Sequence, residues 1–181
     1  MAIDTPVVAM SYLNPILQYG IENFCKAATE AGIDGLILPD LPLPEFQEEY
    51  KAVFDAHNLA MVFLVTPQTS DERIRLLDSE SRGFLYAVSS ASTTGNTEGF
   101  GDAHRAYLER LQNLNLKNPI LVGFGISKAE DVAFVSQYTS GAIMGSAFLR
   151  AISNQTNPAE AAKAFVSGIL EPLQQQQSTQ S

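Results

Sequence analysis

The sequence is poor in cysteine, in basic side chains and in long apolar runs. Its 181 residues include one cysteine, and 11 lysine and arginine residues stand against 20 aspartate and glutamate residues, for a formal net charge of −9. A lone cysteine excludes an internal disulfide framework. Because Cys25 lies among helix-forming residues, we interpret it as a small core residue of a protein in a reducing compartment.

The other scarcities exclude two kinds of partner. No basic run is present to neutralise a phosphate backbone, which argues against nucleic acids and anionic membrane surfaces. The N-terminal stretch lacks the pattern of a signal peptide, and no segment reaches the roughly 18 apolar residues that span a bilayer. We therefore expect a cytoplasmic protein. No spacing of histidine, cysteine and carboxylate residues predicts a metal site, and no cofactor is expected.

Short apolar runs alternate with amphipathic segments along the chain. The runs lack the apolar–polar alternation of a half-exposed strand, which predicts strands buried on both faces of a parallel sheet. Helical spacing between them predicts successive right-handed βα units. The expected strands are 6–10, 35–38, 60–65, 83–88, 119–124 and 141–145, and the expected helices are 20–32, 43–58, 70–81, 101–115, 127–139 and 157–173.

Residues at the segment ends support these helices. Ser70 and Ser127 each precede an acidic first turn, where a hydroxyl accepts a hydrogen bond from an otherwise unpaired backbone N–H. Gly32 stands where a helix C-terminus needs a positive φ. We expect a single partial barrel domain over 1–172 and a disordered glutamine-rich tail over 173–181.

Two architectures accept six consecutive βα units, an open doubly wound sheet and a (β/α)₈ barrel. The open sheet usually has a glycine-rich turn after its first strand, and MSYLNP is not such a turn. A barrel needs eight strands and about 250 residues, so this chain would be two strands short. Glycine turns instead follow the last two strands, where many barrels bind phosphate through backbone N–H groups. The candidate donors are Gly123, Gly125, Gly145 and Ser146.

Five blocks of sequence resemble the tryptophan synthase α subunit. They are MSYLNPILQYGIENF, AGIDGLILPDLPLPE, RGFLYAVSSASTTG, VGFGIS and AIMGSA, and they follow the family order from about Pro6 to Ile152. The resemblance implies a (β/α)₈ TIM barrel and a carbon–carbon lyase of tryptophan biosynthesis. Such an enzyme cleaves indole-3-glycerol phosphate by retro-aldol chemistry into indole and glyceraldehyde 3-phosphate, and a β subunit receives the indole.

The resemblance also assigns roles to residues of this chain. Tyr12 matches a tyrosine that lines the indole pocket, and Tyr86 matches a tyrosine beside the glycerol portion of the substrate. Asp40 matches an aspartate that lies near the site and near the β-subunit contact. Thr94 and Gly95 match the mobile loop after the sixth strand of the family barrel.

Two loops at the end of the chain match the family's phosphate-binding pair. Phe124 and Gly125 belong to one loop, and Gly145 and Ser146 belong to the other. Without the family, the glycines are also consistent with ordinary tight turns, Tyr12 and Tyr86 with core aromatics, and Asp40 with a helix cap ahead of PLPEF.

The chain departs from the family at the catalytic acids. The family's glutamate and aspartate, the acid and base of the retro-aldol step, would precede Pro6, so none of the residues here is assigned a catalytic role. Asp4, Glu45, Glu48 and Glu49 do not replace them, His57 and His104 are expected at the surface, and Ser89 and Ser90 have no triad partners. Three explanations are open: a fragment lacking the first two strands, a non-catalytic phosphate-binding partner of a β subunit, or another phosphate-binding barrel enzyme.

The fragment explanation carries its own expectations. Removing two strands from a closed barrel exposes sheet edges and interior apolar side chains. We therefore expect poor solubility or oligomers, negligible release of indole, and residual affinity for a glycerol phosphate.

Overall fold

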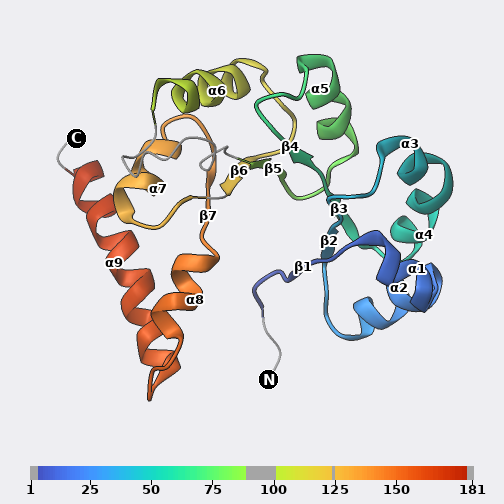
Figure 1. Cartoon of the computed structure of the whole chain (residues 1–181), viewed down its shortest axis with the longest axis horizontal. Coiled ribbons are helices and arrows are strands. Elements are labelled where there is room, and N and C mark those ends of the chain that lie inside the picture. The colour runs from blue at the N-terminus through green and yellow to red at the C-terminus, as the bar shows by residue number, and fades with distance from the viewer. Residues whose placement is uncertain (1–3, 89–100, 124, 179–181) are drawn as a thin grey trace. The chain divides into compact units, whose positions relative to one another are not determined.

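The computed structural model describes residues 4–88, 101–123 and 125–178 (Figure 1). The chain divides into two compact units. Unit 1 comprises Met1–Val65, Thr69–Tyr86 and Lys117–Pro119, and unit 2 comprises Thr66–Gln68, Ala87–Leu116 and Ile120–Ser181. The expectation of a single domain over 1–172 stays a prediction.

Unit 1 contains a parallel sheet of three strands, in the order β1 (Val8–Met10), β2 (Gly35–Ile37) and β3 (Ala60–Val62). The central strand β2 is buried throughout, as its uninterrupted apolar run predicts. Gly35 is required for close pairing, because a Cβ at this position would lie 2.9 Å from the carbonyl oxygen of Ala60. The prediction of parallel strands is therefore confirmed in this unit, and the prediction of burial holds for β2 and most of β3 but not for β1, which is half-buried or exposed along its length.

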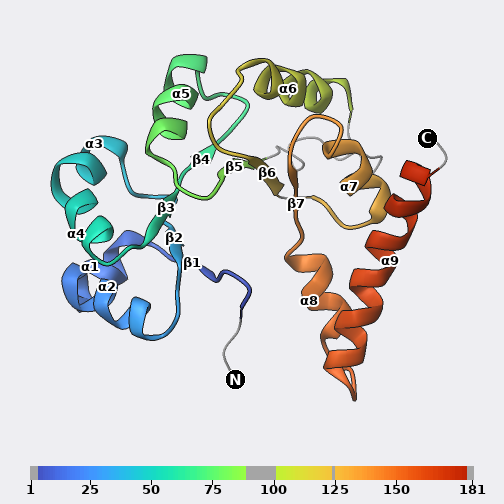
Figure 2. The ribbon, with the colours of Figure 1, turned by 180° about the vertical axis from the view of Figure 1, so that it is seen from behind.

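The helices of unit 1 follow its strands in chain order. Figure 1 and Figure 2 show α1, α2 and α4 on the same side of the β1–β2–β3 sheet. The run 60–65 forms two strands where one was expected, and α1 follows β1 where no separate helix was expected. The bounds are α1 Leu13–Tyr19, α2 Ile21–Glu30, α3 Leu43–Glu45, η1 Phe46–Tyr50, α4 Lys51–Ala56, β4 Leu64–Val65, α5 Asp71–Glu80 and β5 Leu85–Val88.

Aromatic side chains form the centre of the unit 1 core. The Phe46 ring packs edge-on against Phe54 and Phe63, with centroid distances of 5.7 and 5.3 Å. All three are buried, and so is Cys25 on α2. The interpretation of Cys25 as a core residue is confirmed.

The helix ends in unit 1 follow local sequence rules. The hydroxyl of Ser70 accepts a hydrogen bond from the backbone N–H of Arg73 at 3.3 Å, which confirms the predicted cap of α5. Gly32 has φ +80°, as expected after α2.

Unit 2 consists of α6 (Asp102–Asn113), β6 (Ile120–Gly123), α7 (Ala129–Val135), β7 (Gly141–Ile143), α8 (Ser146–Ile152) and α9 (Pro158–Ser178). Strands β6 and β7 pair in parallel, with Leu121 opposite Gly141 and Gly123 opposite Ile143. The α8 and α9 helices pack through Phe148 and Phe165, whose ring centroids lie 5.6 Å apart.

Two expectations fail in unit 2. The start of α7 is capped by Asp131, whose carboxylate accepts the backbone N–H groups of Ser127 and Lys128 at 2.9 and 3.2 Å. The Ser127 hydroxyl donates to the same carboxylate at 3.3 Å, so it does not serve as the predicted cap. The helix α9 runs to Ser178, so the disorder expected for 173–181 does not hold for residues 173–178.

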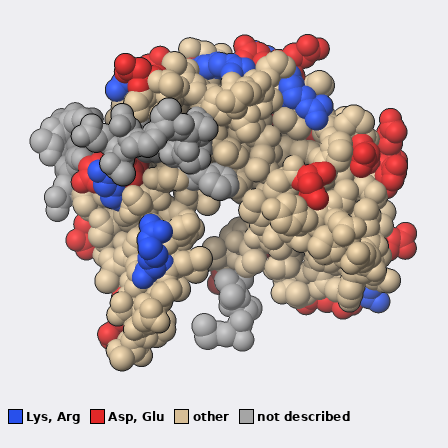
Figure 3. All heavy atoms as spheres, viewed as in Figure 1, with Lys and Arg blue, Asp and Glu red and all other residues tan. Residues whose placement is uncertain are grey.

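Acidic side chains lie over the helices of both units (Figure 3). Across the part of the chain that the structure describes, no helix is long and apolar enough to cross a membrane.

Candidate functional site

The two glycine-bearing loops of unit 2 leave neighbouring strands at the same edge of the sheet. Gly125 follows β6, and Gly145 with Ser146 follows β7; since β6 and β7 are paired in parallel, their carboxyl ends lie side by side. A further backbone hydrogen bond, from the N–H of Ser140 to the carbonyl of Ile120 at 2.9 Å, fixes the start of β7. The structure thus brings together three of the four residues assigned to the phosphate loops, and Phe124 lies outside the described residues.

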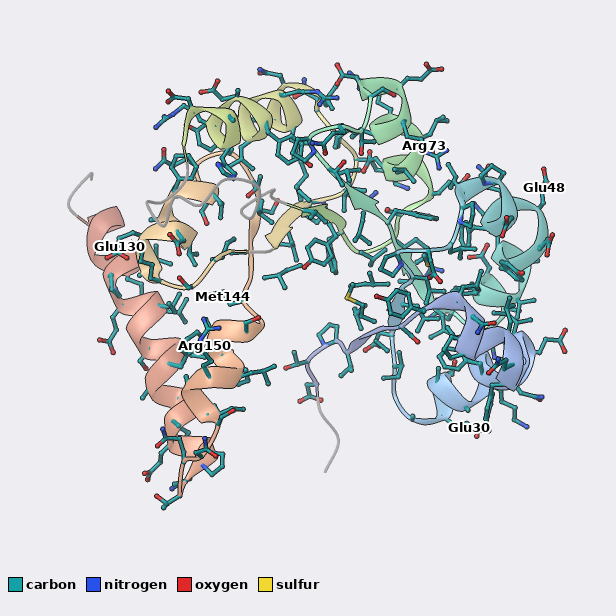
Figure 4. The ribbon with its side chains drawn as sticks, in the orientation of Figure 1. Glu30, Glu48, Arg73, Glu130, Met144 and Arg150 are labelled. Carbon is teal, nitrogen blue, oxygen red and sulfur yellow. The ribbon has the colours of Figure 1, made fainter. Side chains whose placement is uncertain are left out.

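The first turn of α8 offers backbone donors to a ligand. Gly145 immediately precedes this helix, and no side chain caps it. Because the first N–H groups of a helix have no carbonyl partner inside the helix, those that follow Gly145 point outward with a partial positive charge. Gly145 and Ser146 are both exposed. Figure 4 labels Met144, just before this turn, and Arg150 on α8.

The two glycines have different conformational needs. Gly125 has φ +79°, a conformation that residues with a Cβ seldom adopt. Gly145 has φ −94° and ψ −74°, and a Cβ there would meet no atom within 4 Å. The fold therefore requires glycine at 125 and leaves open space at 145, where a ligand could approach the backbone.

The structure joins Tyr12 and Asp40 through the start of α1 in unit 1. Tyr12 directly precedes α1 in an extended conformation, and the residue is 67% exposed. Both carboxylate oxygens of Asp40 accept the backbone N–H of Leu13, at 2.9 and 3.0 Å. Asp40 is thus a helix cap, but of α1 and not of the helix at PLPEF, whose N-cap is Pro42.

Tyr86 lies within β5 and is buried. Its backbone N–H donates to the carbonyl of Phe63 at 2.9 Å, which fixes the strand against its neighbour. Burial raises the pKa of its hydroxyl above the ordinary value of 10.0, so this phenol stays protonated at neutral pH. Its assignment to the glycerol portion of a substrate stays a prediction.

Several sequence-based assignments fall on residues that the structure does not describe. Thr94 and Gly95 lie in the segment 89–100, together with Ser89 and Ser90. Within the described ranges, no group of three or more histidine, cysteine, aspartate or glutamate side chains is placed to hold a metal ion.

Sequence reasoning missed a cluster of charges in unit 1. Glu80, at the end of α5, accepts hydrogen bonds from Lys51 and, at 2.8 Å, from Gln47. These bonds lower the pKa of Glu80 below its ordinary value, and the bond from Lys51 has the larger effect. The partners are 29 and 33 residues apart in sequence, so no local pattern predicts them.

These features define a class of protein. Successive parallel βα elements carry the candidate ligand loops at the carboxyl ends of their strands, as in α/β proteins of the TIM-barrel type. Residues 1–177 match the family described as tryptophan synthase alpha chain. The chain therefore belongs to the tryptophan synthase alpha chain family.

Sequence relatives support the same family. The chain is 56% identical over 152 residues to the tryptophan synthase alpha chain of Flavobacterium johnsoniae, an alignment that covers 84% of this chain and 60% of that protein. It is 54% identical over 151 residues to the corresponding protein of Christiangramia forsetii, covering 83% of this chain and 59% of that one. The chain thus spans about three fifths of the length of these relatives.

Solved structures confirm the fold class. The tryptophan synthase α2β2 complex of Pyrococcus furiosus contains a chain that matches with a TM-score of 0.81 and 34% identity, over 92% of this chain and 67% of that one. The alpha chain of Legionella pneumophila matches with a TM-score of 0.76 and 36% identity, over 92% of this chain and 62% of that one. The predicted α/β fold of the (β/α)₈ TIM-barrel type is confirmed.

Proposed function

We propose that this chain provides the substrate-holding part of a tryptophan synthase α subunit. The reaction is the retro-aldol cleavage of indole-3-glycerol phosphate into indole and glyceraldehyde 3-phosphate, and the partner is a tryptophan synthase β subunit. Family membership favours this reaction over that of another phosphate-binding barrel. A cytoplasmic location stays a prediction.

One observation carries the substrate assignment. The loops after β6 and β7 leave neighbouring parallel strands, and the uncapped start of α8 adds backbone N–H groups beside the exposed Gly145 and Ser146. A phosphate monoester needs several converging donors and space for close approach to the backbone. In our proposal the phosphate of indole-3-glycerol phosphate binds here, with the Ser146 hydroxyl as a further donor.

The 181-residue chain, in this proposal, binds the substrate without cleaving it. The cleavage needs one group to protonate the indole carbon and another to accept the proton of the glycerol hydroxyl. The residues that match the family here are binding residues, and the carboxylate of Asp40 is engaged with the N–H of Leu13. No described carboxylate is therefore assigned either proton-transfer role.

Two measurements on the full chain test the binding and the chemistry separately. Titration with glycerol 3-phosphate, followed by NMR, should shift backbone amide signals of Gly125, Gly145 and Ser146 in a saturable way. Incubation with indole-3-glycerol phosphate, with and without a tryptophan synthase β subunit, should release no indole above the background without protein. Sustained release of indole by the chain alone would show that it holds its own acid and base.

Gly145→Ala gives a sharp test of the phosphate position. Its Cβ meets no protein atom, so the fold should tolerate it, but the methyl group occupies space that the phosphate needs. We expect binding to weaken about tenfold, which corresponds to ~1.4 kcal/mol. Gly168→Ala, on α9 and also in open space, is the matched control and should bind as the parent chain does. Equal affinity in both variants would place the phosphate elsewhere.

A further inference from the structure

A pocket that plays no part in the proposed function lies in unit 1, at the amino ends of its strands. It is a pocket of 280 Å³ whose residues all belong to this unit. Met61 is in β3, and its carbonyl accepts the backbone N–H of Arg82, which precedes β5. Tyr12 and Asp40 follow the carboxyl ends of β1 and β2, so this pocket lies at the opposite end of the same sheet. Its lining consists of Phe46, Lys51, Asp55, Leu59, Met61, Ser79, Glu80, Arg82 and Lys117.

The floor of the pocket is apolar and its rim is charged. Phe46, Leu59 and Met61 are among the most buried side chains of the chain, at 3%, 1% and 1% exposure. They belong to the hydrophobic core, and the pocket exposes only their edges. A ligand with an apolar body would cover these edges, whereas a simple inorganic ion would leave them in water.

The two carboxylates of the rim already have cationic partners. Glu80 accepts from Lys51 and Gln47, and Asp55 accepts from Arg82 at 3.4 Å. A second guanidinium nitrogen of Arg82 donates to the side-chain oxygen of Asn58 at 3.0 Å. These pairs hold Glu80 and Asp55 in place and neutralise their charges.

Among the charged residues that line the pocket, Lys117 is the one cation in excess of the two carboxylates. Its backbone N–H donates to Asp78 at 2.7 Å, which fixes the position of the loop before β6. The hydrogen bond from Lys51 is the main cause of the lowered pKa of Glu80, and the ammonium group of Lys117 adds a smaller effect in the same direction. A net positive pocket on a chain of net charge −9 concentrates small anions locally.

We propose that this pocket binds a small monoanionic carboxylate with an apolar body, with the carboxylate beside Lys117 and Arg82 and the body on Met61 and Leu59. The charge excess of one matches a carboxylate better than a doubly charged phosphate. The volume lies just below the range of drug-sized sites, so the ligand is small. This site is independent of the proposed phosphate loops, which belong to unit 2.

Benzoate is the probe for this site, used with the full chain. We expect a saturable shift of the backbone amide signals of Met61, Arg82 and Lys117 in NMR titrations, with a dissociation constant in the range of about 1 mM or below. Benzamide, of the same shape without charge, should bind more weakly, and acetate, with the charge but no ring, should also bind more weakly. Equal affinity for benzoate and benzamide would overturn the proposed role of charge.

Variants of Lys117 test the location. Lys117→Gln should weaken benzoate binding about threefold to fivefold, the effect of one partly exposed ion pair, and Lys117→Arg should restore it. Lys26→Gln, on the exposed face of α2, makes the same change in net charge outside the pocket and should leave the affinity unchanged. The proposal is wrong if benzoate causes no saturable shift at these amides, or if both glutamine variants weaken binding equally.

Discussion

Both carboxylate oxygens of Asp40 accept the backbone N–H of Leu13, the first residue of α1. This contact joins the segment after β2 to the segment after β1, across 27 residues of sequence. Tyr12 stands immediately before the helix in an extended conformation. A residue matched to the family's active-site region thus has a structural task that can be measured directly.

Replacing Asp40 should loosen the start of α1. Asp40→Ala removes both acceptors and leaves the N–H of Leu13 to water, so we expect a loss of about 1 kcal/mol in the free energy of unfolding. Asp40→Asn keeps one oxygen acceptor and should lose less. Urea denaturation measures the stability, and hydrogen exchange at Leu13 locates the effect. If the alanine variant exchanges at Leu13 no faster than the parent chain, the cap contributes nothing.

The arrangement of strands and most helices follows from patterns that act over a few residues. The apolar runs that form β1, β2, β5, β6 and β7 were all predicted from their continuous apolar signal, although β1 and β7 are less buried than that signal indicates. Local helix caps can also be predicted from the sequence, as at Ser70, whose hydroxyl accepts a hydrogen bond from the backbone N–H of Arg73, three residues away. At α7, however, Asp131 takes the capping role expected of Ser127, since its carboxylate reaches two N–H groups at once.

The contacts that join distant segments were not predictable in the same way. From the sequence, the position of Asp40 just before PLPEF was consistent with a cap of the helix that follows it. In the structure Asp40 caps α1 instead, because the parallel pairing of β1 and β2 brings Leu13 within reach. The two candidate sites differ in the same way, since one was predicted from the sequence and the other was not. The order of the glycine loops predicted that Gly125 and Gly145 follow neighbouring strands, whereas the charged pocket at Lys117 combines residues of 46–61 and 79–82 with Lys117, which are far apart in sequence.

Asp78 should be the most sensitive carboxylate of unit 1. It is 5% exposed and accepts the backbone N–H groups of Lys117 and Asn118 at 2.7 and 3.0 Å, and the side-chain amide of Asn118 at 2.9 Å. Asp78→Ala leaves three part-buried donors without this acceptor, although the Asn118 amide keeps its bond to the Asp78 carbonyl, and we expect a loss of roughly 2–3 kcal/mol in the free energy of unfolding.

Urea denaturation of two variants separates the hydrogen bonds of Asp78 from its size. Asp78→Asn keeps the shape and one acceptor oxygen, so its loss of stability should be clearly smaller than that of Asp78→Ala. Glu72→Ala, at the exposed first turn of the same helix α5, is the control for removing a carboxylate and should change stability little. Similar losses for Asp78→Ala and Glu72→Ala would contradict the assigned role.

The ion pair of Glu80 with Lys51 should make stability depend on acid pH. The hydrogen bonds from Lys51 and then Gln47 hold the pKa of Glu80 in the folded chain below that in the unfolded chain. The unfolded state therefore takes up the proton first as the pH falls, so the contribution is present above the ordinary pKa of about 4.3 and is lost below it. The stability difference between the parent chain and Glu80→Gln should shrink from pH 7 to pH 3. A difference that stays constant over this range would exclude the linkage.

Cys25 should be unreactive in the folded chain. It is fully buried on α2, and burial raises its pKa from 9.0 to about 11, which leaves almost no thiolate at neutral pH. Because the folded pKa is raised, the resulting stability is present below the unfolded pKa and is lost as the pH rises from 9.0 towards about 11. A thiol reagent at pH 8 should therefore label Cys25 slowly in buffer and rapidly in denaturing urea. Cys25→Ser has no thiol, so it controls for labelling at other groups. Because it buries a hydroxyl in place of the thiol, it should also be less stable than the parent chain. If the parent chain is labelled at equal rates with and without urea, the core around α2 opens readily.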